Sequence, residues 1–117
     1  MDSSYQLKLS PLQQQLVAQG QLNEELLINA VSQHADQIGY MLQVYYPREK
    51  VSGVAVVPGS TVLKTEKELS LKLEYVKEEF NVCSDVDTNL KDSMTVSVHS
   101  GVDTGILTIL GESWPEL

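Results

Sequence analysis

Residues 68–80 read Glu-Leu-Ser-Leu-Lys-Leu-Glu-Tyr-Val-Lys-Glu-Glu-Phe, and they carry the clearest secondary-structure signal of the chain. Three leucines and a tyrosine alternate with serine, lysine and glutamate. Because successive side chains of a β-strand point to opposite faces, this spacing places the apolar residues on one face and the charged residues on the other. The stretch therefore predicts a strand in a sheet that has one solvated face and one face covered by another element.

Two helices are predicted upstream, over residues 10–19 and 23–45, and the longer one is the expected cover of the sheet. Each begins with a residue whose side chain accepts hydrogen bonds from the free amides of a first turn, Ser10 and Asn23. Pro11 suits the first position of the first helix, and two glutamates favour the first turn of the second.

The longer helix is predicted from apolar residues that recur every three or four positions. Gly39 interrupts the helix, so we expect a kink or a close helix contact there. An alternative ends the helix near Gly39 and makes residues 40–46 a strand. On the longer helix, the solvated side is expected to hold three glutamines and an aspartate, Gln33, Asp36, Gln37 and Gln43.

The rest of the chain has a β pattern. Residues 4–9 alternate as a short edge strand would, and Val51–Val57 is apolar on both faces, which predicts a strand buried on both sides or lying in an interface. Pro58-Gly59 has the residues of a type II turn that returns the chain as a partner strand. Residues 65–67 either turn or run straight on into the opening stretch. The main strands are expected at about 51–57, 60–65, 68–83, 93–99 and 105–110.

These elements predict an α+β fold in which N-terminal helices pack on one face of an antiparallel sheet of four to five strands. A chain of 117 residues fits a single domain over residues 1–117. The C-terminal tail from Glu112 is expected to be loose unless Trp114 anchors it on an apolar patch.

Composition excludes several classes of function. A net charge of −8 and a pI near 4.5 argue against nucleic acid and against anionic membranes as partners, since both are bound by clustered lysine and arginine. With Cys83 as the only cysteine, the chain has no intramolecular disulfide, which favours a reducing compartment. No signal peptide and no membrane span are visible, so we expect a cytoplasmic protein.

No catalytic motif stands out, and we expect neither a cofactor nor a metal. Asp85-Val86-Asp87-Thr88-Asn89 begins like a calcium loop, but leucine follows where the EF-hand has glycine, so a polar turn is expected. His34 lies on the apolar side of the longer helix and His99 on the polar side of its strand. Cys83 ends an apolar strand, where it is expected to be a small packed residue rather than a nucleophile.

Three functional hypotheses follow. The first is a small acidic, non-enzymatic binding or assembly protein, such as an adaptor, chaperone, inhibitor or mobile-element product, that forms a homodimer or binds another protein. Its expected interface residues are Val51, Val54, Val56, Ile38, Leu42 and Tyr46.

The second hypothesis is a ligand-binding or enzymatic pocket between helix and sheet, lined by His34, Tyr40, Tyr45 and Tyr75. The third is an acidic surface that captures a basic partner, formed by Glu66, Glu68, Glu74 and Glu78.

Overall fold

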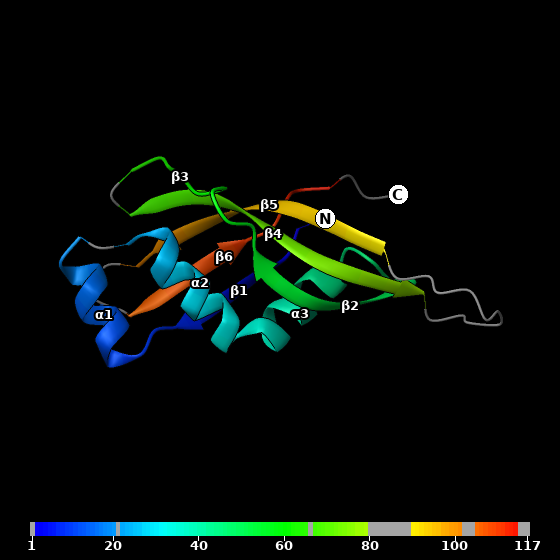
Figure 1. Cartoon of the computed structure of the whole chain (residues 1–117), viewed down its shortest axis with the longest axis horizontal. Coiled ribbons are helices and arrows are strands. Elements are labelled where there is room, and N and C mark those ends of the chain that lie inside the picture. The colour runs from blue at the N-terminus through cyan, green and yellow to red at the C-terminus, as the bar shows by residue number, and fades with distance from the viewer. Residues whose placement is uncertain (1, 21, 66, 80–89, 102–104, 115–117) are drawn as a thin grey trace.

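The computed structural model of the chain describes residues 2–20, 22–65, 67–79, 90–101 and 105–114 (Figure 1). These residues form an α+β fold with helices packed on an antiparallel sheet, which confirms the predicted class. In chain order the elements are β1 Ser4–Lys8, α1 Pro11–Ala18, α2 Glu24–Gln33, α3 Ala35–Gln43, β2 Glu49–Val56, β3 Val62–Leu63, β4 Glu68–Glu79, β5 Leu90–Ser100 and β6 Ile106–Leu110.

The sheet has the strand order β1-β6-β5-β4-β2, with β3 also paired to β4. β4 is the opening stretch of the sequence, and it pairs with β5 over ten consecutive residue pairs. Its leucines and Tyr75 lie on the covered face and are at most 1% exposed, as the alternation predicts. Helices α2 and α3 run along that face (Figure 1). The core is therefore a layer of aliphatic side chains between these two helices and the sheet.

The first two helices begin where their caps predict. Ser10 and Gln13 form a capping box, in which each side chain accepts from the backbone N–H of the other residue at 3.2 and 3.0 Å. The Asn23 side chain accepts from the N–H of Leu26 at 3.0 Å. Both helix starts are thus decided locally.

The single helix predicted over 23–45 is wrong, because the chain breaks at His34 into α2 and α3. His34 has φ −120° and ψ 23°, outside the helical range, and its Nδ1 lies 3.1 Å from the hydroxyl of Tyr5 on β1. Gly39 does not end the helix. It lies inside α3, where an added Cβ atom would stand 3.8 Å from Val51 and Val54, so the helix packs on strand β2 at this glycine rather than closely on another helix. Residues 40–43 are helical, and the alternative strand over 40–46 is also wrong.

The predicted hairpin between 51–57 and 60–65 is not formed. The turn is present, since Gly59 has φ 79° and the N–H of Ser60 donates to the carbonyl of Val57 at 3.2 Å. However, the chain passes through it and continues along the same edge of β4, where only Val62 and Leu63 pair. The reversal comes later, where Lys64 and Thr65 both donate to the Glu68 carbonyl at 3.0 Å. The chain therefore reverses between β3 and β4 instead of running straight on.

Strand β2 is not buried on both faces. Its pairing with β4 shifts register between Ser52 and Ala55, and Gly53 in the shift has φ 64°. Such a β-bulge changes which residues face the core. Val51, Val54 and Val56 consequently all point inward, while Ser52 and Ala55 are exposed.

The described sheet has six strands rather than four to five, because the N-terminal segment joins it as β1 beside β6. The predicted strands at 93–99 and 105–110 are present as β5 and β6, while residues 80–83 of the strand predicted over 68–83 lie outside the described residues. None of the helices in the described ranges is long and apolar enough to cross a membrane.

Candidate functional site

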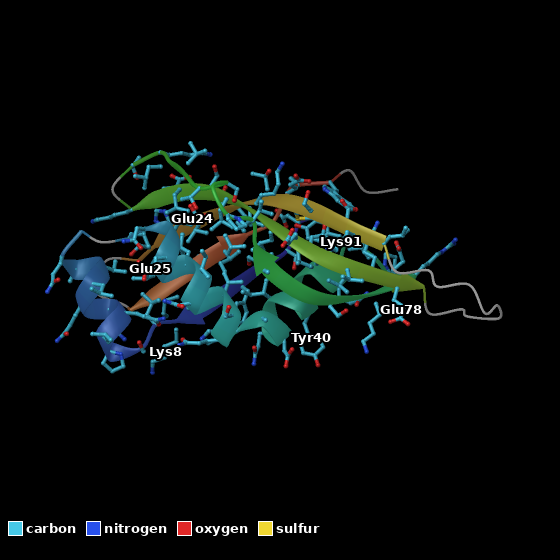
Figure 2. The ribbon with its side chains drawn as sticks, in the orientation of Figure 1. Lys8, Glu24, Glu25, Tyr40, Glu78 and Lys91 are labelled. Carbon is cyan, nitrogen blue, oxygen red and sulfur yellow. The ribbon has the colours of Figure 1, made fainter. Side chains whose placement is uncertain are left out.

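The four residues of the expected pocket lie in separate environments. His34 contacts Tyr5, and Tyr40 is 75% exposed on the outer side of α3, pointing away from the sheet (Figure 2). The hydroxyl of Tyr45 accepts from the N–H of Ser3 at 2.9 Å and donates to the carbonyl of Glu112 at 2.6 Å. Tyr75 instead bonds to Tyr46. The structure does not bring these four side chains together.

A hollow of about 570 Å³ lies beside α1 and the adjoining ends of β5 and β6. Figure 1 shows where these three elements lie in the fold. Its walls come mainly from small, apolar and amide residues, and among the described residues Lys67 is the one charged side chain that lines it. None of the expected pocket residues lines it. His34, Tyr40, Tyr45 and Tyr75 thus take no part in this hollow.

Tyr46 and Tyr75 belong to a polar cluster at the far end of β4. The ammonium of Lys77 lies 3.0 Å from a carboxylate oxygen of Asp92, 3.9 Å from one of Glu49 and 4.7 Å from the centre of the Tyr46 ring. The sequence contains a signal for this cluster, because Lys77 has the same parity as Leu73 and Tyr75 and so falls on the covered face.

The pKa values of three groups in this cluster depart from their ordinary values. Burial raises the pKa of Tyr75, and its bond to Tyr46 raises it further. Burial acts to lower the pKa of Lys77, but Asp92 and Glu49 outweigh it and the pKa is raised. Burial acts to raise the pKa of Asp92, but the Ser93 amide and Lys77 leave it lowered. The contacts of Lys77 with Asp92 on β5 and with Glu49 on β2 join β4 to both of its neighbouring strands.

Trp114 packs beside this polar cluster, against Tyr45 and Tyr46. Its ring packs edge-on against Tyr45 and Tyr46, with centroids 4.8 and 5.5 Å away, and its Nε1 donates to the Glu112 carboxylate at 2.9 Å. Trp114 therefore anchors the C-terminal tail on an aromatic patch, which was the stated exception to the expectation of a loose tail.

The expected interface residues are occupied within the chain. Val51, Val54, Val56, Ile38, Leu42 and Tyr46 are all at most 8% exposed and pack in the core between α3 and β2. This internal packing accounts for their apolar character.

The two outer edges of the sheet differ, and this difference defines the candidate site. On β2, the side chain of Gln43 covers the edge: its Oε1 accepts from the N–H of Val51 at 3.0 Å, and its Nε2 donates to the carbonyls of Glu49 and Tyr46. The helix pattern placed Gln43 on the solvated side, and this prediction is wrong, because Gln43 is half-buried and bonded to the β2 edge. The bulge at Gly53 interrupts the same edge further along.

Nothing within the described ranges pairs with the outer edge of β1. Leu9 donates to the carbonyl of Gly105, and Ser3 accepts from Gly111, both at 2.9 Å, so the odd-numbered residues of β1 face β6. In an antiparallel pair the intervening residues point their N–H and C=O groups the other way. These are Ser4, Gln6 and Lys8, which are all exposed. We call their backbone groups the open edge.

No hydrogen bond to the open edge is present among the described residues. Lys8 projects outward at the end of β1 (Figure 2). The alternation of residues 4–9 predicted an edge strand here, but it could not show whether other groups would bond to the outward N–H and C=O groups.

The described residues contain no group of three or more histidine, cysteine, aspartate or glutamate side chains placed to hold a metal ion. Cys83, residues 85–89 and Glu66 lie outside the described ranges. Comparisons of the chain with models of protein families, with curated proteins and with solved structures found no match.

Proposed function

We propose that this protein is a non-enzymatic binding or assembly protein that acts by pairing the open edge of β1 with a strand of another chain. The observation that carries the proposal is the contrast between the two sheet edges. Gln43 and a bulge cover β2, whereas β1 presents the N–H and C=O groups of three residues.

Sheet edges are usually protected, because unpaired N–H and C=O groups form a template on which another strand can add. Bulges, charges and covering side chains are common protections, and β2 has two of them. On β1, Ser4 and Gln6 are uncharged, and Lys8 stands only at the end of the strand. Strand addition is an established mode of recognition, in which the main chain supplies affinity and alternate side chains supply specificity.

The polar side chains also favour binding over catalysis. Tyr75, Tyr46, Lys77 and Asp92 bond to one another, and their pKa values are shifted away from neutrality. The carboxylates of the proposed acidic surface are interspersed with bases, since Lys72 lies between Ser70 and Glu74 on the solvated face and Lys50 lies opposite Glu78. An acidic mimic is accordingly the weaker proposal.

The test replaces Gln6 by proline. Proline removes the outward N–H and breaks no bond to β6, because Gln6 donates away from β6, and proline is tolerated on edge strands for this reason. The matched control is Gln6→Thr, which keeps the N–H and removes the side-chain amide.

Each protein is tagged and used for capture from lysate, beside residue-resolved amide exchange of the purified protein. We expect Gln6→Pro to lose the partner that wild type and Gln6→Thr retain, with protection of the Ser4 and Lys8 amides in the wild-type complex. Equal capture by all three proteins, with the Ser4 and Lys8 amides exchanging freely, would overturn the proposal.

A further inference from the structure

We propose that the hollow beside α1 is a binding site for a small carboxylate with an apolar body, such as a medium-chain fatty acid. Ser100 and Lys67 bind the carboxylate, and apolar side chains of the walls cover the hydrocarbon part. The site is separate from the open edge of β1, because Ser4, Gln6 and Lys8 do not line it. The inference therefore goes beyond the proposed function and does not depend on it.

Two polar side chains come together where β4 begins and β5 ends. The Ser100 N–H donates to the Lys67 carbonyl at 2.8 Å, so the pairing of Glu68 with His99 continues for one more residue pair. Lys67 has the same parity as Leu69, and both Lys67 and Ser100 line the hollow on the covered side of the sheet. Side chains that stand opposite each other in an antiparallel pair are neighbours, so one ligand group can contact both.

The Ser100 hydroxyl has an unused hydrogen-bond donor at the hollow. Ser100 is only 6% exposed, and no hydrogen-bond partner of its hydroxyl is present within the described ranges. Buried polar groups almost always have a partner, because an unsatisfied group costs free energy. The hydroxyl is not sealed in the core, so it opens into the hollow that the residue lines. A bound acceptor there supplies the missing hydrogen bond.

The charge of the walls selects an anion as that acceptor. Among the described residues, Lys67 is the one charged side chain that lines the hollow, and no lining residue is acidic. Lys67 forms no ion pair in the part of the chain that the structure describes, whereas Lys77 contacts two carboxylates. An ammonium group and a hydroxyl that bind the same carboxylate form charge-assisted hydrogen bonds, which are stronger than neutral ones.

The remaining walls fit an apolar body. Leu9, Val17 and Ile106 line the hollow together with small residues of α1. Its volume of about 570 Å³ lies within the range of small-molecule sites. Such sites are mostly apolar and contain a few polar groups that fix the orientation of the ligand. A carboxylate at one end of a hydrocarbon chain has the same division.

Hydrogen bonds join the walls, so the hollow is formed before a ligand enters. Leu9 donates to the Gly105 carbonyl at 2.9 Å, and the side-chain amide of Gln14 donates to the Leu9 carbonyl at 3.0 Å. Gly101 donates to the Ile106 carbonyl at 3.1 Å. These bonds fix α1 to the end of β1 and to the start of β6. A preformed site binds a ligand without the cost of ordering its own residues.

The test titrates the full chain with octanoate and follows its backbone amides by two-dimensional NMR. We expect the amide signals of Gln14, Ser100 and Gly101 to shift, because these residues line the hollow. Octanamide is the uncharged ligand of the same length. We expect it to bind about fivefold more weakly than octanoate, because it forms no charge pair with Lys67.

Two variants separate the polar contacts. Lys67→Met keeps a long unbranched side chain and removes the charge, and we expect the affinity for octanoate to fall about fivefold while that for octanamide stays unchanged. Ser100→Ala removes a hydroxyl without a partner in the described protein, and we expect the affinity for octanoate to fall about tenfold. Lys91→Met and Ser93→Ala, on the opposite face of the sheet, are the matched controls and should bind octanoate as wild type does.

The amide spectrum of each variant also shows whether it folds, so a loss of binding can be told from a loss of structure. Shifts confined to the hollow, with weaker binding of octanoate by Lys67→Met or Ser100→Ala, support the inference. Shifts scattered over the surface, no shift at the hollow, or unchanged affinity in both folded variants would overturn it. Equal affinities of the wild type for octanoate and octanamide would also overturn it, since the site would then not select a carboxylate.

Discussion

Gln43→Ala is the substitution that most directly tests how this sheet controls its edges. The Gln43 side chain accepts from Val51 and donates to the carbonyls of Glu49 and Tyr46, so it joins the end of α3 to the edge of β2. Alanine removes all three contacts while keeping a good helix former at the last position of α3.

The expected loss of stability can be worked from these contacts. One protein hydrogen bond contributes about 0.5–1.5 kcal/mol net, and the freed groups lie at an edge where water can reach them, which favours the lower part of that range. Three such contacts give an expected decrease of about 2 kcal/mol in the free energy of unfolding. Gln37→Ala is the matched control, because Gln37 lies on the exposed side of the same helix, and it should change stability by less than about 0.5 kcal/mol.

Urea unfolding followed by fluorescence of Trp114 measures both values, since this single tryptophan packs on Tyr45 and Tyr46 beside α3. Light scattering over a range of concentrations measures a second effect. With Val51 and Glu49 uncovered, β2 becomes an additional open edge, and we expect larger assemblies than those of the wild type. Equal midpoints for Gln43→Ala and Gln37→Ala, with no growth of assemblies, would refute the assigned role of Gln43.

Two further predictions concern the tail and the polar cluster. Gly111→Ala would place a Cβ atom 2.5 Å from the Tyr45 hydroxyl, and we expect the free energy of unfolding in urea to fall by about 2 kcal/mol. Adding Tyr45→Phe to this variant should recover part of the lost stability. An unchanged urea midpoint for Gly111→Ala would contradict the packing. Asp92→Asn removes the ion pair with Lys77, and because Asp92 is partly exposed we expect it to cost about 0.5–1 kcal/mol at pH 7. The pKa of Asp92 is lowered in the folded protein, so its contribution is present above the ordinary value of 3.8 and is lost as the pH falls through the folded value. The stability gap between wild type and Asp92→Asn should therefore close in acid, and a gap that widens there would show that the pKa is not lowered.

Features that depend on neighbours in the chain were predictable. The alternation in β4 places its leucines on one face whatever the partner strands are, because the period of a strand is two. Ser10 and Asn23 cap helices through bonds to amides three residues away, and Gly59 has the positive φ that its turn requires. These interactions are local, so the residue pattern is sufficient for them.

Features that depend on distant residues were not predictable. The Pro58-Gly59 turn is the same whether the chain reverses or continues along β4, so the local sequence could not show that no hairpin forms there. The break at His34 lies at a residue that contacts Tyr5 across 29 positions of sequence. The expected pocket residues were chosen by residue type alone. Tyr40 and Tyr75 do not lie together, because Tyr40 points to solvent and Tyr75 points into the core.

The candidate site combines both kinds of information. The alternation of residues 4–9 was enough to indicate an edge strand, and the parity of Ser4, Gln6 and Lys8 follows from it once β6 is known to be the neighbour. That this edge is open while the opposite one is closed depends on Gln43, a residue whose helical position suggested exposure. Local sequence sets which side chains share a face, but the pairing of backbone groups between strands is a property of the folded chain, because it depends on which distant segment arrives at each edge.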